Sequence, residues 1–162
     1  MTRAELQARA RLIASQYGIP PQGFVAQISQ ESNWDPNAVN AGSGAQGLGQ
    51  FMPPTWQEWG QGLSPFDPVA SLDAAARYMR WIRQWLTGQG LSGTWEQALA
   101  SYNWGIGNVR TAVNTYGADW LETAPLETRE YVRKIAPEYY SGSTVSPIAI
   151  AVVSGLILWG LS

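Results

Sequence analysis

The longest regular pattern in the sequence is a line of apolar residues that begins after Pro68. Its members recur at intervals of three and four residues for about five turns: Val69, Leu72, Ala76, Met79, Ile82 and Leu86. Such spacing places them on one face of a long helix, and burying that face requires other elements to pack around it. Strand-like alternation of apolar and polar residues is almost absent. The sequence therefore predicts a mainly α-helical fold.

Shorter helices are predicted on both sides of this one. Thr2 and Glu5 form a capping box, and the helix that they open runs until Gly18. A second helix follows a pair of prolines and covers Gln22 to about Ser32. The other expected helices are residues 55–60, a helix opened by a second capping box at Thr94 and Gln97, and residues 108–115 and 126–139.

The chain has 162 residues and 45% hydrophobic residues, enough for a single core. No charged residue follows Glu138, and Ser146-Pro147 begins an apolar stretch that continues to the end. As a helix with ~1.5 Å rise per residue, this stretch would be shorter than the ~30 Å hydrocarbon core of a membrane. We expect a globular domain at 1–141 and a hydrophobic segment at 142–162. The segment 147–162 is expected to associate with a membrane, with docking on the domain as the alternative.

Composition restricts the chemistry that is available. Cys and His are both absent, which excludes disulfides, zinc sites and Ser-His or Cys-His nucleophiles. We expect no metal and no cofactor. The net charge of −2 gives no basic surface for nucleic acid, so nucleic acid is not an expected partner. Catalysis must use carboxyl groups, tyrosines, amides or the backbone.

The segment Gly42–Gly47 fits the dinucleotide-binding pattern G-x-G-x-x-G residue for residue. That pattern needs a strand before the glycines and a helix that begins at them. Here the preceding residues 32–41 are rich in turn formers, and Pro53-Pro54 prevents a helix from running through the loop. We therefore expect no nucleotide at this loop.

Glu31 stands where an apolar residue is expected. Phe24, Ile28 and Glu31 have the spacing i, i+4 and i+7, so the carboxyl group shares the buried face of its helix. Burial and the nearby C-terminal end of the helix both disfavour the charged form and raise the pKa of Glu31 towards neutrality. This environment suits a general acid that works at pH 7. An ordinary helix-end Glu paired with an Arg is the alternative.

Several motifs occur together, in a set order, around this residue. They are Glu31-Ser32, Gly47-Leu48-Gly49-Gln50, Met52-Pro53-Pro54-Thr55, Ala100-Ser101-Tyr102-Asn103-Trp104-Gly105 and Glu127-Thr128-Arg129-Glu130-Tyr131-Val132. Their order resembles that of the lytic transglycosylases related to the soluble-lytic-transglycosylase family, which have a lysozyme-like fold. The family usually has Met where this chain has Gly49, and we expect this difference to alter one binding subsite.

The resemblance implies an enzyme that cleaves the β-1,4 bond between N-acetylmuramic acid and N-acetylglucosamine in peptidoglycan without water. The products carry 1,6-anhydro-muramoyl ends. Glu31 acts first as the acid and then as the base, while the acetamido group of the substrate stabilises the intermediate. Two alternatives stay open, namely a goose-type lysozyme that hydrolyses the same bond and a non-catalytic wall-binding virion protein.

The resemblance also assigns binding roles. The expected substrate-binding residues are Ser32, Gly47, Leu48, Gln50, Met52, Tyr102, Asn103, Glu127 and Tyr131. The glycine-rich loop is expected to form a sugar-binding wall, with Tyr102 available to Glu31 or to the acetamido group. Asp35 precedes Pro36 and is interpreted as a turn residue. Four tryptophans beside the motifs are candidates for stacking on sugars or for core packing: Trp34, Trp56, Trp59 and Trp104.

The N-terminal residues 1–15 are charged and lack the apolar run of a signal peptide. Together with the hydrophobic C-terminal segment, this favours a phage enzyme. We expect it in the virion, associated with membrane, or in the bacterial cell envelope.

Overall fold

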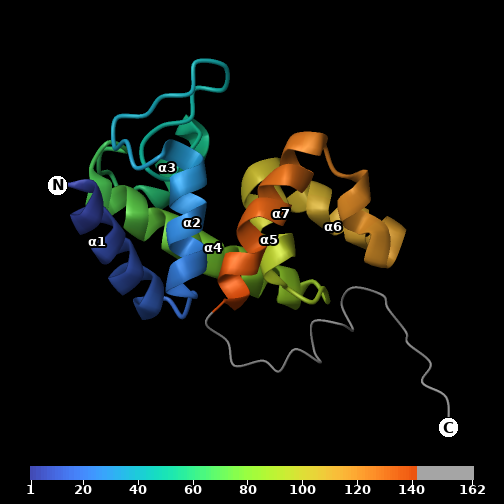
Figure 1. Cartoon of the computed structure of the whole chain (residues 1–162). Coiled ribbons are helices and arrows are strands. Elements are labelled where there is room, and N and C mark those ends of the chain that lie inside the picture. Colours follow the sequence, from blue (N-terminus) through green and yellow to red (C-terminus); the bar gives the residue numbers. More distant parts are fainter. Residues whose placement is uncertain (142–162) are drawn as a thin grey trace, which may run out of the picture.

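The computed structural model describes residues 1–141, which form seven α-helices and one 3₁₀-helix (Figure 1). The elements are α1 (Arg3–Gln16), α2 (Pro21–Ser32), α3 (Pro53–Trp59), α4 (Pro68–Gly88), α5 (Trp95–Trp104), α6 (Ile106–Tyr116), η1 (Gly117–Thr123) and α7 (Leu126–Tyr140). Extended pairing within this part of the chain is limited to isolated bridges at Gln46. The prediction of a mainly α-helical domain is confirmed.

The predicted long helix, α4, is the central element. Asp67 caps its first turn by accepting hydrogen bonds from the backbone N–H groups of Val69 and Ala70, both at 2.9 Å. From Leu72 onward the predicted apolar line is fully buried, whereas Val69 is 40% exposed because it lies in the first turn, at the edge of the core. The side chains of Leu72, Ala76, Met79, Ile82 and Leu86 therefore form the centre of the core.

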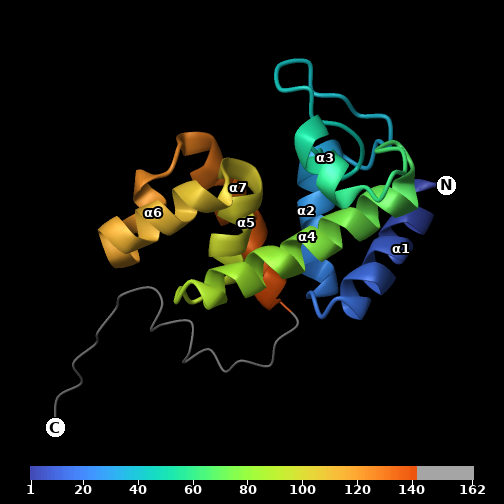
Figure 2. The same cartoon turned by 180° about the vertical axis from the view of Figure 1, so that it is seen from behind.

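Two groups of helices pack on α4. Helices α1, α2 and α3 lie on one side of the molecule and α5, α6 and α7 on the other, and α4 runs along both groups (Figures 1 and 2). The groups also meet directly where α2 packs against α7. A Cβ atom at Gly23 would lie only 2.3 Å from the ring of Tyr139, so this glycine permits the close approach of α7 to α2.

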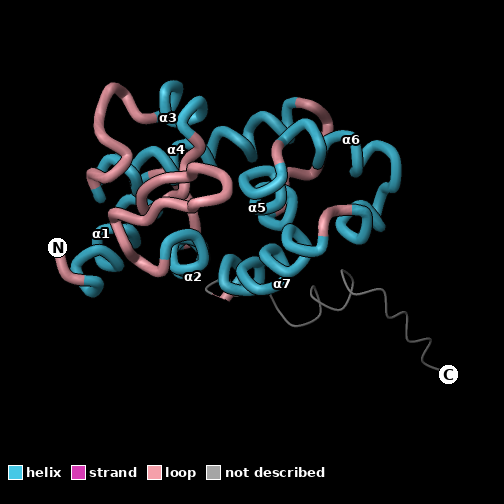
Figure 3. The backbone as a smooth tube through the Cα atoms, turned by 90° about the horizontal axis from the view of Figure 1, so that it is seen from above, coloured by secondary structure: helices cyan, strands magenta, loops and turns pink. Residues whose placement is uncertain are grey.

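The helix ends follow the predicted signals with small shifts, except that the second capping box is only half formed. The Thr94 hydroxyl accepts from the backbone N–H of Gln97, but Oε1 of Gln97 accepts from the N–H of Gly93 instead of that of Thr94. The capping box of Thr2 and Glu5 is present, and Gly18 adopts a left-handed conformation (φ 68°) directly after α1. α2 and α3 each begin one or two residues earlier than expected because proline is favourable in the first turn of a helix. The loop of residues 33–52, drawn among the pink segments of Figure 3, connects α2 to α3.

None of the helices in residues 1–141 is long and apolar enough to cross a membrane. The predicted membrane association of residues 147–162 lies outside the described residues.

Candidate active site

Glu31 lies in the last turn of α2, on the face of that helix that packs into the core. Phe24 and Ile28 on the same face are fully buried, and the Glu31 side chain is half-buried. The helix ends shortly after Glu31 because Asn33 adopts a left-handed conformation (φ 49°) and donates its backbone N–H to the carbonyl of Ser29. The predicted apolar environment of the carboxyl group is confirmed.

The surroundings of Glu31 favour its protonated form. Its pKa is raised to about 7, chiefly by burial; the hydrogen bond from Tyr131 works against this rise, and the negative charge of Glu127 adds to it. None of the ion pairs within residues 1–141 includes Glu31, so the alternative of a pairing with Arg is not found there. A carboxylic acid with such a pKa is protonated in about half of the molecules at neutral pH, so it can both donate and accept a proton there.

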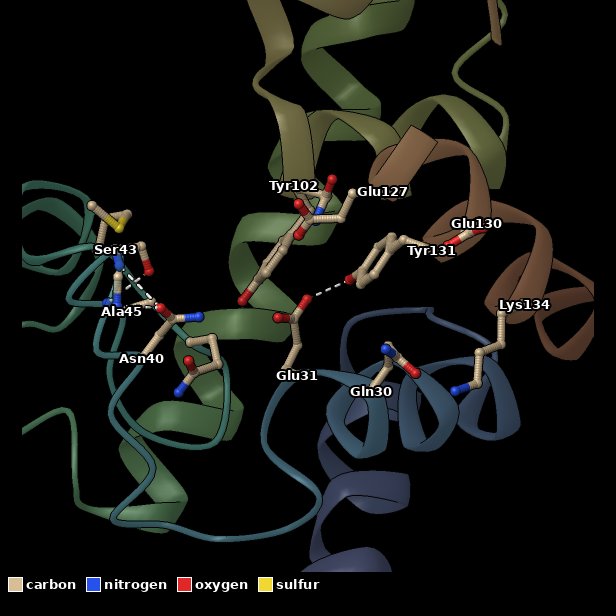
Figure 4. Close-up of a pocket in the computed structure, with 14 residues that line it drawn as sticks. Gln30, Glu31, Asn40, Ser43, Ala45, Tyr102, Glu127, Glu130, Tyr131 and Lys134 are labelled. Carbon is tan, nitrogen blue, oxygen red and sulfur yellow. Dashed lines mark hydrogen bonds between the residues drawn. The ribbon is translucent and has the colours of Figure 1, made fainter. Parts of the chain in front are cut away.

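Tyr131 in α7 holds the carboxyl group in place. Its hydroxyl donates a hydrogen bond to Oε1 of Glu31, while the other carboxyl oxygen points away from the tyrosine (Figure 4). Burial, together with the nearby charge of Glu31, raises the pKa of Tyr131 well above its ordinary value. The hydroxyl therefore keeps its proton and remains a hydrogen-bond donor, and one oxygen of Glu31 stays free for a ligand.

A cavity of about 730 Å³ surrounds Glu31, large enough for several sugar rings. Its walls come from α2, the following loop, α5 and α7 (Figure 4). The lining residues are Gln30, Glu31, Asn40, Gly42, Ser43, Ala45, Gln50, Met52, Tyr102, Asn103, Glu127, Glu130, Tyr131 and Lys134. Carboxyl, amide and hydroxyl groups dominate this surface, which suits a ligand rich in hydroxyl and amide groups.

Most of the predicted site residues meet in this cavity. With Glu31 they are Gln50, Met52, Tyr102, Asn103, Glu127 and Tyr131. Ser32 and Leu48 do not line it, contrary to expectation. Ser32 is buried and its hydroxyl donates to the carbonyl of Ile28 (3.3 Å), while Leu48 is fully buried in the core. Ser32 directly follows Glu31 in sequence, but its side chain and that of Leu48 lie in the interior.

Gly47 is also absent from the cavity lining, and its conformation explains why glycine is needed there. The residue has a φ of +73°, and a Cβ atom would lie 2.0 Å from the backbone carbonyl oxygen of Pro65. The glycine thus allows the loop to pack against the segment before α4. Its role is structural, which corrects the expectation that it contacts the substrate.

Tyr102 contacts the loop rather than Glu31. Its hydroxyl donates to the backbone carbonyl of Gly49 at 2.6 Å, and its ring lies 5.9 Å from the ring of Phe51. Burial, with the charge of Glu31 as the next cause, raises the pKa of Tyr102 well above its ordinary value. Of the two partners expected for the Tyr102 hydroxyl, Glu31 and the acetamido group of the substrate, Glu31 is therefore not the group that it bonds. The residue fastens the loop to α5 while it lines the cavity.

Two amide side chains of the site are also used in holding it together. Nε2 of Gln50 donates to the carbonyls of Gly47 (3.0 Å) and Ala38 (3.3 Å) and so braces the loop. Oδ1 of Asn103 accepts a hydrogen bond from the hydroxyl of Thr128 at 2.7 Å and ties α5 to α7. Each side chain lines the cavity with its position already fixed, which reduces the entropy lost on binding.

The four tryptophans that were candidates for stacking do not line the cavity. Trp34 and Trp56 are buried in the core, and the Trp56 ring N–H donates to the carbonyl of Leu63 at 2.8 Å. Trp59 and Trp104 are half-buried against the core. Trp34 and Trp56 therefore serve core packing, which was the alternative to stacking on sugars.

Asp35 accepts a hydrogen bond from the backbone N–H of Asn37 at 2.9 Å. The interpretation of Asp35 as a turn residue is thus confirmed.

Seven cavity residues were not named as site residues from the sequence: Gln30, Asn40, Gly42, Ser43, Ala45, Glu130 and Lys134. For α7 a signal was available, because Glu127, Glu130 and Lys134 follow one another at helical spacing with Tyr131. One residue known to face the site therefore predicts the other polar residues on the same face. The loop residues had no such periodic signal.

Comparison with known proteins shows to which family this chain belongs. The family model described as "Transglycosylase SLT domain" matches residues 10–121. A curated relative, the membrane-bound lytic murein transglycosylase D of Escherichia coli strain K12, is 32% identical over 126 residues. The match covers 71% of this chain and 26% of that protein.

Solved structures show the same fold. A complex of the 70-kDa soluble lytic transglycosylase with bulgecin A superposes with a TM-score of 0.70 at 25% identity, covering 84% of this chain and 24% of that one. An inactive mutant of the lytic transglycosylase Slt from Pseudomonas aeruginosa gives a TM-score of 0.68 at 27% identity, covering 83% and 24%. The chain thus spans about a quarter of the length of these relatives.

Proposed function

Because the chain belongs to the transglycosylase SLT domain family, we propose that it cleaves the β-1,4 bond between N-acetylmuramic acid and N-acetylglucosamine in peptidoglycan as a lytic transglycosylase. One observation carries this proposal. Glu31 presents a carboxyl group with a pKa of about 7 to a polar cavity of about 730 Å³. The relatives named above are lytic transglycosylases, which supports the same reaction here.

Bond cleavage begins with the proton of Glu31. The neutral carboxyl group donates it to the glycosidic oxygen, and the bond between that oxygen and C1 of the muramoyl sugar breaks. The N-acetylglucosamine side leaves with a new hydroxyl group. The 2-acetamido group of the muramoyl sugar stabilises the positive charge at C1, so no second protein carboxylate is needed as a nucleophile.

The second step uses the carboxylate that the first step leaves behind. Glu31 accepts the proton of the C6 hydroxyl while the C6 oxygen bonds to C1, which gives the 1,6-anhydro product and restores the acid. The Tyr131 hydroxyl donates to Oε1 and stabilises this carboxylate. A pKa of about 7 suits both steps because the two protonation states are then close in free energy at neutral pH.

The substrate is held by the remaining cavity residues. Asn103 and Glu127 offer polar groups to the sugars from α5 and α7, and Met52, which directly precedes α3, offers apolar surface. Gln50 and Tyr102, fixed by their own hydrogen bonds, shape the wall that the strand follows. We propose that these residues position the bond to be cleaved next to Glu31.

Hydrolysis of the same bond, as in a goose-type lysozyme, is the second candidate. Glu127 and Glu130 bring two further carboxyl groups to the cavity, and inverting glycosidases use a second carboxylate to activate water. A non-catalytic wall-binding protein has no need for a half-buried carboxyl group with a raised pKa, so it is the weaker alternative.

We propose that the enzyme works in the bacterial cell envelope, where its substrate lies. The E. coli relative is named as a membrane-bound enzyme, which fits this location. Membrane association through residues 147–162 and packaging in a phage virion stay predictions.

The proposal is tested with Glu31→Gln, which keeps the shape of the side chain but removes the proton donor. Lysis of purified peptidoglycan is expected to fall by at least ~10²-fold, because a positioned acid contributes ~10²- to 10⁴-fold. Binding to the same sacculi is expected to persist. Retention of more than about a tenth of the activity would exclude Glu31 as the acid.

A further inference from the structure

A row of aromatic rings extends over the surface beyond the cavity. It consists of Trp59 in α3 and of Tyr78, Trp81 and Trp85 in α4, and we refer to it as the aromatic stripe. The ring centroids of neighbouring members lie 5.0 Å (Trp59 to Tyr78), 5.9 Å (Tyr78 to Trp81) and 6.4 Å (Trp81 to Trp85) apart. Tyr78 and Trp81 are nearly parallel, with 16° between their planes.

The stripe lies on a different face of α4 from the apolar residues that form the core. Tyr78, Trp81 and Trp85 are spaced i, i+3 and i+7 and share a face, whereas Met79 and Ile82 on the buried face are fully buried. Trp81 is 38% exposed, and the other three rings are half-buried. Trp59, Tyr78 and Trp85 pack partly against the core, and together with the exposed Trp81 they leave a row of ring surface open to solvent. Apolar surface of this kind often marks a binding site.

The stripe is continuous with the candidate active site. The ring of Tyr78 lies 5.5 Å from that of Tyr102, which lines the cavity around Glu31. From there the stripe follows α4, which runs from the α3 side of the molecule towards α6 (Figure 2). The stripe therefore begins beside a ring that lines the cavity.

Arginines lie at both ends of the stripe. The Arg77 guanidinium lies 5.9 Å from the centre of the Trp59 ring, where it is fixed by Asp73 and by the Trp59 carbonyl. The Arg110 guanidinium in α6 lies 6.0 Å from the Trp85 ring. Flat apolar faces bordered by hydrogen-bond donors match a ligand with apolar faces and polar edges.

We propose that the aromatic stripe is a second glycan-binding surface, which holds the sugars of the strand beyond those in the cavity. The inference rests on the proposed function, since it takes the cavity ligand to be a peptidoglycan strand. In β-1,4-linked N-acetylhexosamines the ring substituents are equatorial, so both faces of each ring carry C–H groups that stack on aromatic rings. The hydroxyl and acetamido groups lie at the edge, within reach of arginine.

The test compares short and long ligands on the full-length chain. Calorimetry measures the affinity of the N-acetylglucosamine trimer and hexamer, and of long glycan strands freed of peptides, for Glu31→Gln, which cannot turn them over. Trp81→Ala is then added to this variant, with Trp81→Phe as a milder change that keeps a ring. Tyr116→Ala removes a 54% exposed ring outside the stripe and serves as the control.

We expect Trp81→Ala to weaken the binding of long strands by roughly three- to tenfold and to leave the trimer unaffected. Trp81→Phe is expected to lose less affinity for long strands than Trp81→Ala, and Tyr116→Ala is expected to lose none. Equal affinities of parent and Trp81→Ala for every length would overturn the inference. So would a change in oligomeric state or in vesicle binding in place of glycan binding, because the stripe would then hold a second copy or an apolar segment.

The same samples separate this inference from the proposed function. If the wild-type protein digests peptidoglycan but Trp81→Ala leaves the affinity for long strands unchanged, only the assignment of the aromatic stripe is wrong. If the wild-type protein neither digests peptidoglycan nor binds any glycan, the proposed function fails and the inference fails with it.

Discussion

The hydroxyl of Tyr131 in α7 donates a hydrogen bond to the carboxyl group of Glu31 in α2, 100 residues away in sequence. This contact joins the two groups of helices at the candidate active site. It favours the carboxylate, whereas burial favours the acid, and the balance places the pKa of Glu31 at about 7. If the chain has the proposed activity, that activity is therefore expected to depend on pH through this pair.

Removing the hydrogen bond shifts the pH dependence upward. In Tyr131→Phe the carboxylate loses a donor, so the pKa of Glu31 rises above its present value of about 7. Since the acid must be protonated to act, the alkaline limb of the profile of kcat/KM against pH moves to higher pH, while the maximum falls because the carboxyl group is less well oriented. A profile with an unchanged alkaline limb would show that this hydrogen bond does not tune the acid.

Removing the nearby negative charge has the opposite effect. The charge of Glu127 raises the pKa of Glu31, so Glu127→Gln lowers it and moves the alkaline limb to lower pH. Glu127→Asp keeps the charge and is the matched control. Shifts of the same sign in Glu127→Gln and Tyr131→Phe would contradict the assignment of both effects to Glu31.

Folding stability provides a second measure of the buried carboxyl group. The pKa of Glu31 is raised from 4.5 to about 7, so its ionisation costs folding free energy, and stability is lost as pH rises through about 7. Glu31→Gln cannot ionise and is expected to exceed the wild type in stability by about 1–3 kcal/mol at pH 8, with little difference at pH 4. Urea unfolding at both values measures this. Glu130→Gln, an exposed change in the same cavity, is expected to show no such gain.

Substitutions at two glycines of the loop distinguish the stability cost of a steric clash from that of backbone strain. Gly44 and Gly47 both have positive φ, 79° and 73°, but only Gly47 has an atom in the way of a Cβ, the Pro65 carbonyl oxygen at 2.0 Å. Gly44→Ala is expected to cost about 1 kcal/mol of unfolding free energy from strain alone, and Gly47→Ala about 2–4 kcal/mol because the loop must also shift. Chemical denaturation checks both values. Equal losses would mean that the contact with Pro65 is not retained.

The local part of this fold was predictable and the long-range part was not. The apolar spacing from Leu72 to Leu86 predicts α4, and the spacing of Phe24, Ile28 and Glu31 predicts a carboxyl group in an apolar environment, because both signals lie within one helix. The hydrogen bond of Tyr102 to Gly49 depends on how α5 docks on a loop 53 residues away, which no local pattern encodes.

In the glycine-rich loop, too, the sequence pattern did not predict the long-range contacts. The pattern at Gly47 indicates that a side chain is not tolerated, but only the fold shows that the obstacle is Pro65 and not a ligand. Likewise, Ser32 and Leu48 are buried because of the way the chain turns after α2 and before α3. Motifs therefore located the site, and packing decided which of their residues face the cavity.

Mass spectrometry of peptidoglycan digested by the wild-type protein and by Glu31→Gln tests the central claim most directly. If Glu31 serves as acid and then as base without water, the wild type releases fragments with 1,6-anhydro-muramoyl ends and Glu31→Gln releases none. Fragments with hydrated reducing ends would instead identify a muramidase. Anhydro products formed at wild-type rate by Glu31→Gln would contradict the assignment of the catalytic carboxyl group.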